Sequence, residues 1–117
     1  MFRIASRREG KLQIISLSGK VDDGACKGLA EALEAGCRSF NEHVLLDLQD
    51  LAAINRSRQR IILKYLSELH RSGWHLIVCQ PRQAVQYAFY ETGMDRVMTI
   101  LPTLQEAKTF VLSRRKY

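Results

Sequence analysis

The sequence predicts an α/β domain with one mixed, mostly parallel sheet of four to five strands and four helices. Strand-like and helix-like segments alternate along the chain, which favours right-handed crossovers between parallel strands. The strand-like run at residues 44–48 is apolar except for Asp47, and the run at 76–79 is apolar throughout, as expected for central strands covered on both faces. A length of 117 residues with 46% hydrophobic content suffices for one core, so residues 1–117 should form a single domain.

The first half of the chain predicts two strands, a helix and a buried strand. Residues 11–21 are rich in apolar side chains, and residues 2–5 can pair beside them as a short edge strand. Residues 25–40 repeat apolar side chains at helical spacing, although Gly36 weakens the last turn. The continuous run at 44–48 is the next strand.

The second half predicts three further helices and two strands. A helix over residues 56–71 ends at Ser72-Gly73, where glycine permits a left-handed cap, and a strand follows at 76–79. Pro81 suits the first turn of a third helix that ends at Gly93. Residues 97–101 form the last strand, and Thr103-Leu-Gln-Glu106 is a capping box for a terminal helix. The side chains expected to share one core are Leu46, Leu48, Ile62, Leu66, Ile77 and Val78.

The net charge of +6 comes from the two ends of the chain. Three arginines lie within residues 1–8, and two arginines and a lysine lie within 114–117. Residues 9–113 contain 12 basic and 12 acidic side chains, so the folded body is formally neutral. This distribution argues against a nucleic-acid-binding face.

Cysteines and apolar runs indicate a cytosolic protein without a cofactor. Cys26, Cys37 and Cys79 are odd in number and unclustered, so they predict buried thiols and neither a disulfide framework nor a metal site. No apolar run reaches the roughly 18 residues of a membrane helix, and the N-terminus lacks a signal peptide. No glycine-rich phosphate loop occurs, and the three histidines have no nucleophile and orienting acid at a catalytic spacing. We expect no enzyme activity.

Several short motifs resemble those of the STAS domain, the fold of bacterial anti-sigma-factor antagonists. Leu17-Ser-Gly19-Lys-Val-Asp22 is similar to the Leu-x-Gly-x-Leu-Asp turn of that family, and Glu91-Thr-Gly-Met94 is similar to its Ser/Thr-Gly-Leu segment. The family's Asp-Ser-Ser/Thr-Gly-Leu motif corresponds here to Asn55-Arg56-Ser57-Arg58-Gln59. The resemblance implies a protein-docking module, with Ser57 at the phosphoacceptor position and Asp22 near the partner surface. The Asp and Gly of the motif have become Asn and Arg.

The chemistry of this turn is unusual. If Asn55 caps the helix, Ser57 lies at its second position, where free N–H groups and the macrodipole favour an anion. Arg56, Arg58 and Arg60 add three cations there, and Arg56, Arg60 and Lys64 recur every four residues on one face. Such a cluster opposes the dipole, so we expect these side chains to be exposed and to bind a partner.

Three interpretations of the cluster remain open at this point: arginines that stabilise phosphorylated Ser57, a constitutive docking surface for an acidic protein, and a solvated charged face. The resemblance implies a regulatory module of the anti-sigma-factor-antagonist type, with an anti-sigma factor or a related serine kinase as the partner. The alternative is a soluble STAS subunit of a phospholipid ABC-type transport complex, because the basic ends suit peripheral association with an acidic membrane.

A phosphoaspartyl receiver domain is a further alternative, because Asp22, Asp23 and Asp47 superficially resemble its acidic pocket. Only one helix separates the acidic pair from Asp47, whereas a receiver pocket needs a further strand and helix between them. The sequence therefore disfavours this alternative.

Overall fold

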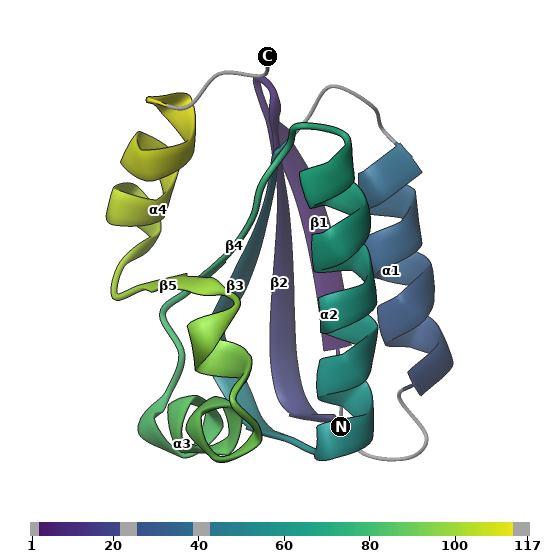
Figure 1. Cartoon of the computed structure of the whole chain (residues 1–117), viewed down its shortest axis with the longest axis vertical. Coiled ribbons are helices and arrows are strands. Elements are labelled where there is room, and N and C mark those ends of the chain that lie inside the picture. Colours follow the sequence, from purple (N-terminus) through teal and green to yellow (C-terminus); the bar gives the residue numbers. More distant parts are fainter. Residues whose placement is uncertain (1–2, 22–25, 39–42, 114–117) are drawn as a thin grey trace.

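The structure is a computed structural model that describes residues 3–21, 26–38 and 43–113. A single five-stranded sheet runs in the order β1-β2-β3-β4-β5 (Figure 1). The β1–β2 pair is antiparallel and the other pairs are parallel, which confirms the predicted mixed, mostly parallel sheet. The strands are β1 (Arg3–Glu9), β2 (Leu12–Val21), β3 (His43–Ile54), β4 (Leu76–Cys79) and β5 (Thr99–Leu101).

Four α-helices and one short 3-10 helix connect and follow these strands in the described residues. They are α1 (Cys26–Arg38), α2 (Arg56–Arg71), α3 (Gln83–Thr92), η2 (Met94–Arg96) and α4 (Leu104–Leu112). The sequence predicted α2 and β4 at their observed bounds. The predicted β1 and β3 are shorter than the observed strands, and the predicted β5 is longer. The ends of these strands carry polar side chains or show little periodicity, so the sequence defines them poorly. Pro81 lies ahead of α3, whose N-cap is Arg82, so its predicted place in the first turn is wrong.

The helices divide unequally between the two faces of the sheet. The larger core joins side chains of α1, α2 and α3 to one face, and includes Leu33, Ile62 and Phe89. The smaller core contains Ala107 and Val111 of α4 against the other face. Of the described helices, α1, α2 and α3 therefore cover one face, and α4 covers part of the other.

This division corrects the predicted core. Leu46, Leu48, Ile62 and Val78 lie together in the larger core, but Ile77 belongs to the smaller one. The reason is the two-residue period of a strand, which points Ile77 and its neighbour Val78 to opposite faces. Leu66 is only half-buried at the margin of the larger core.

The residues predicted to end α2 and α3 and to begin α4 do so in the structure. Gly73 follows the last turn of α2 with a φ of +84°, and Gly93 ends α3 with a φ of +79°, both in the left-handed region that favours glycine. The Thr103 hydroxyl accepts a hydrogen bond from the backbone N–H of Glu106 at 3.1 Å, so it caps α4.

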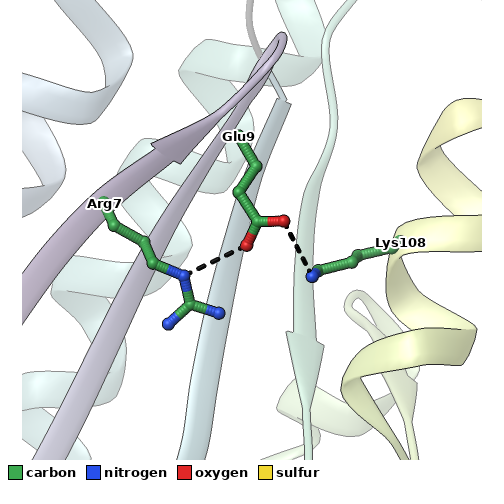
Figure 2. A network of polar contacts seen from close by, with 3 residues as sticks. All are labelled: Arg7, Glu9 and Lys108. Carbon is green, nitrogen blue, oxygen red and sulfur yellow. Dashed lines mark hydrogen bonds and ion pairs between the residues drawn. The ribbon is translucent and has the colours of Figure 1, made fainter.

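An exposed ion network joins α4 to the first strand (Figure 2). Glu9 Oε2 lies 3.1 Å from Arg7 Nε, and Glu9 Oε1 lies 2.9 Å from Lys108 Nζ. Hydrogen bonds from Lys108 and Arg7 lower the pKa of Glu9 below its ordinary value, so the carboxylate is charged at neutral pH.

His43 is a buried titratable group at the start of β3. Its ring lies edge-on against Trp74, with 5.0 Å between centroids, and stacks on His75 at 5.3 Å. His43 Nδ1 accepts a hydrogen bond from the backbone N–H of His75 at 3.2 Å. Burial, and then the nearby charge of His75, lower the pKa of His43 from its ordinary value of 6.5.

The different burial of Ile62 and Leu66 predicts different costs for two truncations on α2. Ile62→Ala removes a fully buried side chain and should reduce the free energy of unfolding by about 2–5 kcal/mol. Leu66→Ala removes a half-buried one and should cost less than about 2 kcal/mol. Urea titrations of both variants measure the difference; a larger loss for Leu66→Ala would contradict the observed orientation of α2.

The depressed pKa of His43 predicts acid-sensitive stability. The unfolded chain binds a proton at His43 more readily than the folded chain does. The contribution of His43 to the free energy of unfolding should therefore be constant above about pH 6.5 and should be lost as the pH drops from there through the folded pKa. His43→Gln should reduce the slope of unfolding free energy against pH in that window. Unchanged pH dependence in the variant would show that His43 is not the responsible group.

Candidate functional site

The candidate site begins where β3 passes into α2. Asn55 is extended, with φ −89° and ψ 171°, and its Oδ1 accepts a hydrogen bond from the backbone N–H of Arg58 at 3.0 Å. Gln59 N–H donates to the carbonyl of Asn55 at 3.1 Å, as the first bond of the helix. Asn55 is therefore the N-cap, and Ser57 lies at the second helical position with its side chain exposed.

A basic strip follows from this turn along α2. Arg56, Arg60 and Lys64 are all exposed at four-residue spacing, and the first turn contains no acidic residue. Lys64 Nζ lies 5.3 Å from the ring centroid of Tyr65, which fixes the far end of the strip. We call Arg56, Ser57, Arg60 and Lys64 the basic strip.

The prediction that Arg58 is exposed is wrong, since only 9% of this residue is accessible. Positions 58, 62, 65 and 69 fall on one helical stripe, and Ile62, Tyr65 and Leu69 of that stripe are buried. Extending the apolar stripe back by one turn would have placed Arg58 on the inner side. The burial removes one of the three predicted surface cations.

A groove separates the basic strip from the end of α3. Its volume is about 350 Å³, and Met94 at its floor is 6% exposed. The groove therefore combines cations on one wall with an apolar base. Its lining residues are Arg56, Gln59, Arg60 and Leu63 from α2, with Glu91, Thr92 and Met94 from the α3–η2 segment.

Gln59 and Thr92 connect the two walls of this groove. The Thr92 hydroxyl donates to Gln59 Oε1 at 2.5 Å, and Gln59 is only 2% exposed. A buried amide without such a partner would be destabilising, so the contact favours one spacing of α2 and α3. No local sequence signal indicates this pair, because the two residues are 33 positions apart.

A second polar cluster fixes the loop between β4 and α3. Asp47 Oδ1 accepts from Gln80 Nε2 at 2.9 Å and from the backbone N–H of Gln49 at 3.1 Å. Arg82 Nε donates to the carbonyl of Gln49 at 2.9 Å. Gln80 has a φ of +58°, which is strained for a residue with a side chain. No local sequence pattern indicates this network, because its partners are about 33 positions apart.

Asp47 also affects the neighbouring thiol. Burial, and then the negative charge of Asp47, raise the pKa of Cys79 to about 12, so this free cysteine stays protonated. The predicted buried thiol is confirmed at this position. The side chains of Cys26 and Cys37 lie outside the described residues, as does Asp22, the residue expected near a partner surface.

The described residues contain no group of three or more histidine, cysteine, aspartate or glutamate side chains arranged to hold a metal ion. What the basic strip offers is a set of guanidinium and ammonium groups beside a helix N-terminus, which together attract an anionic group. The groove beside it adds apolar surface. This combination suits a protein partner with both acidic and apolar side chains.

A profile of the STAS domain covers residues 3–107, nearly the whole chain. The chain belongs to the STAS domain family. Its sheet order also excludes a receiver domain, which has the strand order 2-1-3-4-5, because the STAS sheet here runs 1-2-3-4-5 with an antiparallel first strand.

Solved structures with this STAS fold include three that are described as anti-sigma-factor antagonists. One from Mycobacterium paratuberculosis has a TM-score of 0.87 at 20% identity, covering 95% of this chain and 94% of its own. One from Thermotoga maritima has a TM-score of 0.85 at 17% identity, covering 92% and 93%. SpoIIAA in its unphosphorylated form has a TM-score of 0.79 at 18% identity, covering 99% and 100%. At these identities the likeness establishes the shared fold.

Among the described parts of this STAS domain, no helix has the length and hydropathy needed to cross a membrane.

The Gln59–Thr92 contact predicts a coupled pair of mutations. Thr92→Val alone leaves the amide oxygen of buried Gln59 without its partner and should cost about 1–3 kcal/mol of unfolding free energy. Gln59→Leu alone should cost less, because the Thr92 hydroxyl also lies within hydrogen-bond distance of the carbonyls of Ala88 and Phe89. The double variant replaces both partners with apolar groups and should cost less than the sum of the two. Chemical denaturation of the four proteins gives the coupling energy, and simple additivity would mean that the hydrogen bond does not join α2 to α3.

Proposed function

We propose that this chain is a non-enzymatic protein-binding module of the anti-sigma-factor-antagonist type, which docks an acidic partner surface on the basic strip and the adjoining groove. The observation that carries this proposal is the exposure of Arg56, Ser57 and Arg60 at the start of α2, beside a groove with a buried apolar floor. Three solved structures of the same fold are described as anti-sigma-factor antagonists, which supports the partner class. Such a regulatory role is consistent with a cytosolic protein.

The positive charges at the start of α2 oppose formation of the helix and would favour binding of an acidic partner. Arg56 and Arg60 are like charges four residues apart near the positive end of the helix dipole, so each lowers helix stability by a few tenths of a kcal/mol to about 1 kcal/mol. An acidic partner would relieve both effects. Exposed tyrosines lie on the same helix as the far wall of the groove: Tyr87 is 59% and Tyr90 66% exposed, with 6.4 Å between ring centroids. Tyrosine and arginine are common anchors in protein interfaces.

Removing the exposed arginines should separate binding from stability. Arg56→Gln/Arg60→Gln should fold at least as stably as the parent chain, lose most of its partner affinity at low salt and show a flatter dependence on salt. Lys11→Gln/Arg71→Gln is the matched control, because it removes the same charge from exposed positions away from the strip. Affinity purification from the native host with each variant as bait, followed by calorimetry with the recovered protein, measures both effects. Equal binding by both double variants would refute docking on the strip.

Phosphorylation of Ser57 is the proposed regulation of this surface. Its place at the second helical position, next to two exposed guanidinium groups, would allow a phosphate to meet backbone N–H groups and Arg56 or Arg60. Two other hydroxyls are engaged in structure: Thr103 caps α4, and Ser72 donates to the carbonyl of Glu68 at 3.3 Å.

Mass analysis of the protein from its native host should therefore locate any phosphate on Ser57. Ser57→Asp should weaken partner binding by adding negative charge where an acidic surface docks, whereas Ser57→Ala should bind normally. Phosphate on another residue would overturn the assignment. If Ser57→Asp binds the partner normally, and if the protein from the native host carries no phosphate with or without stress, a constitutive docking surface would be favoured.

A further inference from the structure

The first strand of the sheet has a long edge that no described strand covers. β1 spans seven residues and pairs only with β2, at the end of the sheet farthest from β5 (Figure 1). An uncovered strand edge presents backbone N–H and C=O groups that can pair with another strand. The opposite edge, β5, has only three residues, which is one of the ways in which proteins protect an edge.

Apart from its charged side chains, β1 lacks the other protective features of an edge strand. It contains no proline, and the register shifts lie between β2 and β3, so the β1–β2 ladder is regular from Arg3 to Glu9. Helix α1 packs on one face of β1: a Cβ added to Gly28 would lie 3.7 Å from Ile4 Cδ1. All residues of β1 except Ile4 are exposed. Its charged side chains are therefore what determines which strand can pair there.

Those charges select one register for a second copy of β1. If a two-fold axis perpendicular to the sheet relates the two copies, the two β1 strands run antiparallel and each side chain keeps its own face of the joined sheet. Two residues that oppose each other must then point to the same face, and only every second register satisfies this condition. Pairing centred on Ala5 places Arg3 opposite Arg7, and pairing centred on Arg7 places that residue opposite itself. Pairing centred on Ser6 uses all seven residues and opposes no like charges. It places Arg3 opposite Glu9 at both ends.

We propose that this STAS domain forms a two-fold dimer through antiparallel pairing of β1 with β1 of a second copy, with Ser6 at the axis and Arg3 of each copy opposite Glu9 of the other. The pairing would join the two sheets into one of ten strands. Glu9 already contacts Arg7 and Lys108 (Figure 2), and a carboxylate has enough lone pairs to accept a further guanidinium. Paired edges of this length bury less than a standard interface, so the dimer is weak and depends on concentration.

Cysteine cross-linking tests the register. In Ser6→Cys the two thiols face each other across the axis, at the spacing of directly opposed residues. In Arg8→Cys they are offset by four residues along the strand, roughly 13 Å, which is beyond the reach of a disulfide. Mild oxidation at a protein concentration that populates the dimer should cross-link Ser6→Cys and leave Arg8→Cys as monomer. The parent chain reports any background from its three native cysteines.

Charge exchange tests the same pairing without cysteines. Arg3→Glu places two carboxylates opposite each other, and Glu9→Arg places two guanidinium groups opposite each other, so each should weaken dimerisation about tenfold or more in sedimentation equilibrium. The double variant restores opposite charges and should recover the parent dissociation constant to within about threefold. Thermal melts confirm that the variants fold, since Glu9→Arg also removes the contact with Lys108.

Cross-linking of Ser6→Cys alone, together with recovery in the double exchange, supports the β1 dimer. A parent chain that stays monomeric at every concentration, equal cross-linking at positions 6 and 8, or no recovery in the double exchange overturns it. The partner-binding variants at Arg56 and Arg60 should leave dimerisation unchanged, because neither residue lies on β1.

Discussion

The strand β3 is the constraint on which the rest of the domain depends. It is central in the sheet, pairs with β2 and β4, and has Leu45 on the smaller core and Val44, Leu46 and Leu48 on the larger one. A strand covered on both faces cannot shift its register without exposing an entire row of apolar side chains. Since α2 begins two residues after β3 ends, the fixed strand also fixes where the basic strip emerges.

The uneven distribution of helices explains where binding surfaces are available. Helices α1 to α3 share one face, so the turns that enter α2 and leave α3 lie near each other and leave a groove between them. Helix α4 packs on the other face, and the Glu9–Lys108 contact ties it to the first strand. The edge of β1 remains open at one side of the sheet. The two proposed contacts, with an acidic partner and with a second copy, therefore use different parts of the molecule.

Most of the architecture could be predicted from the sequence because its signals are local. Continuous apolar runs gave β3 and β4, helical spacing gave α2, and Gly73, Gly93 and Thr103 marked helix ends that the structure confirms. Apart from the bounds of three strands and the place of Pro81, the mistakes concern which way a side chain faces. The assignment of Ile77 to the larger core ignored the alternation of a strand, and Arg58 was assumed to be exposed because it is charged. Contacts between distant segments, such as Gln80 with Asp47, have no local signal at all.

The altered motif of this STAS domain changes the surface while preserving the helix start. Asn55 stands where the family has Asp and still caps α2 through its side-chain oxygen, because either residue can accept from the third backbone N–H. Gln59 stands where the family has Leu, and Thr92 supplies the partner that its buried amide needs. Arg58 replaces Gly but lies on the buried stripe, so the added bulk is directed inward. The outward-facing change is thus Arg56 next to the retained Ser57, and this pair is where recognition would differ from that of relatives with the usual motif.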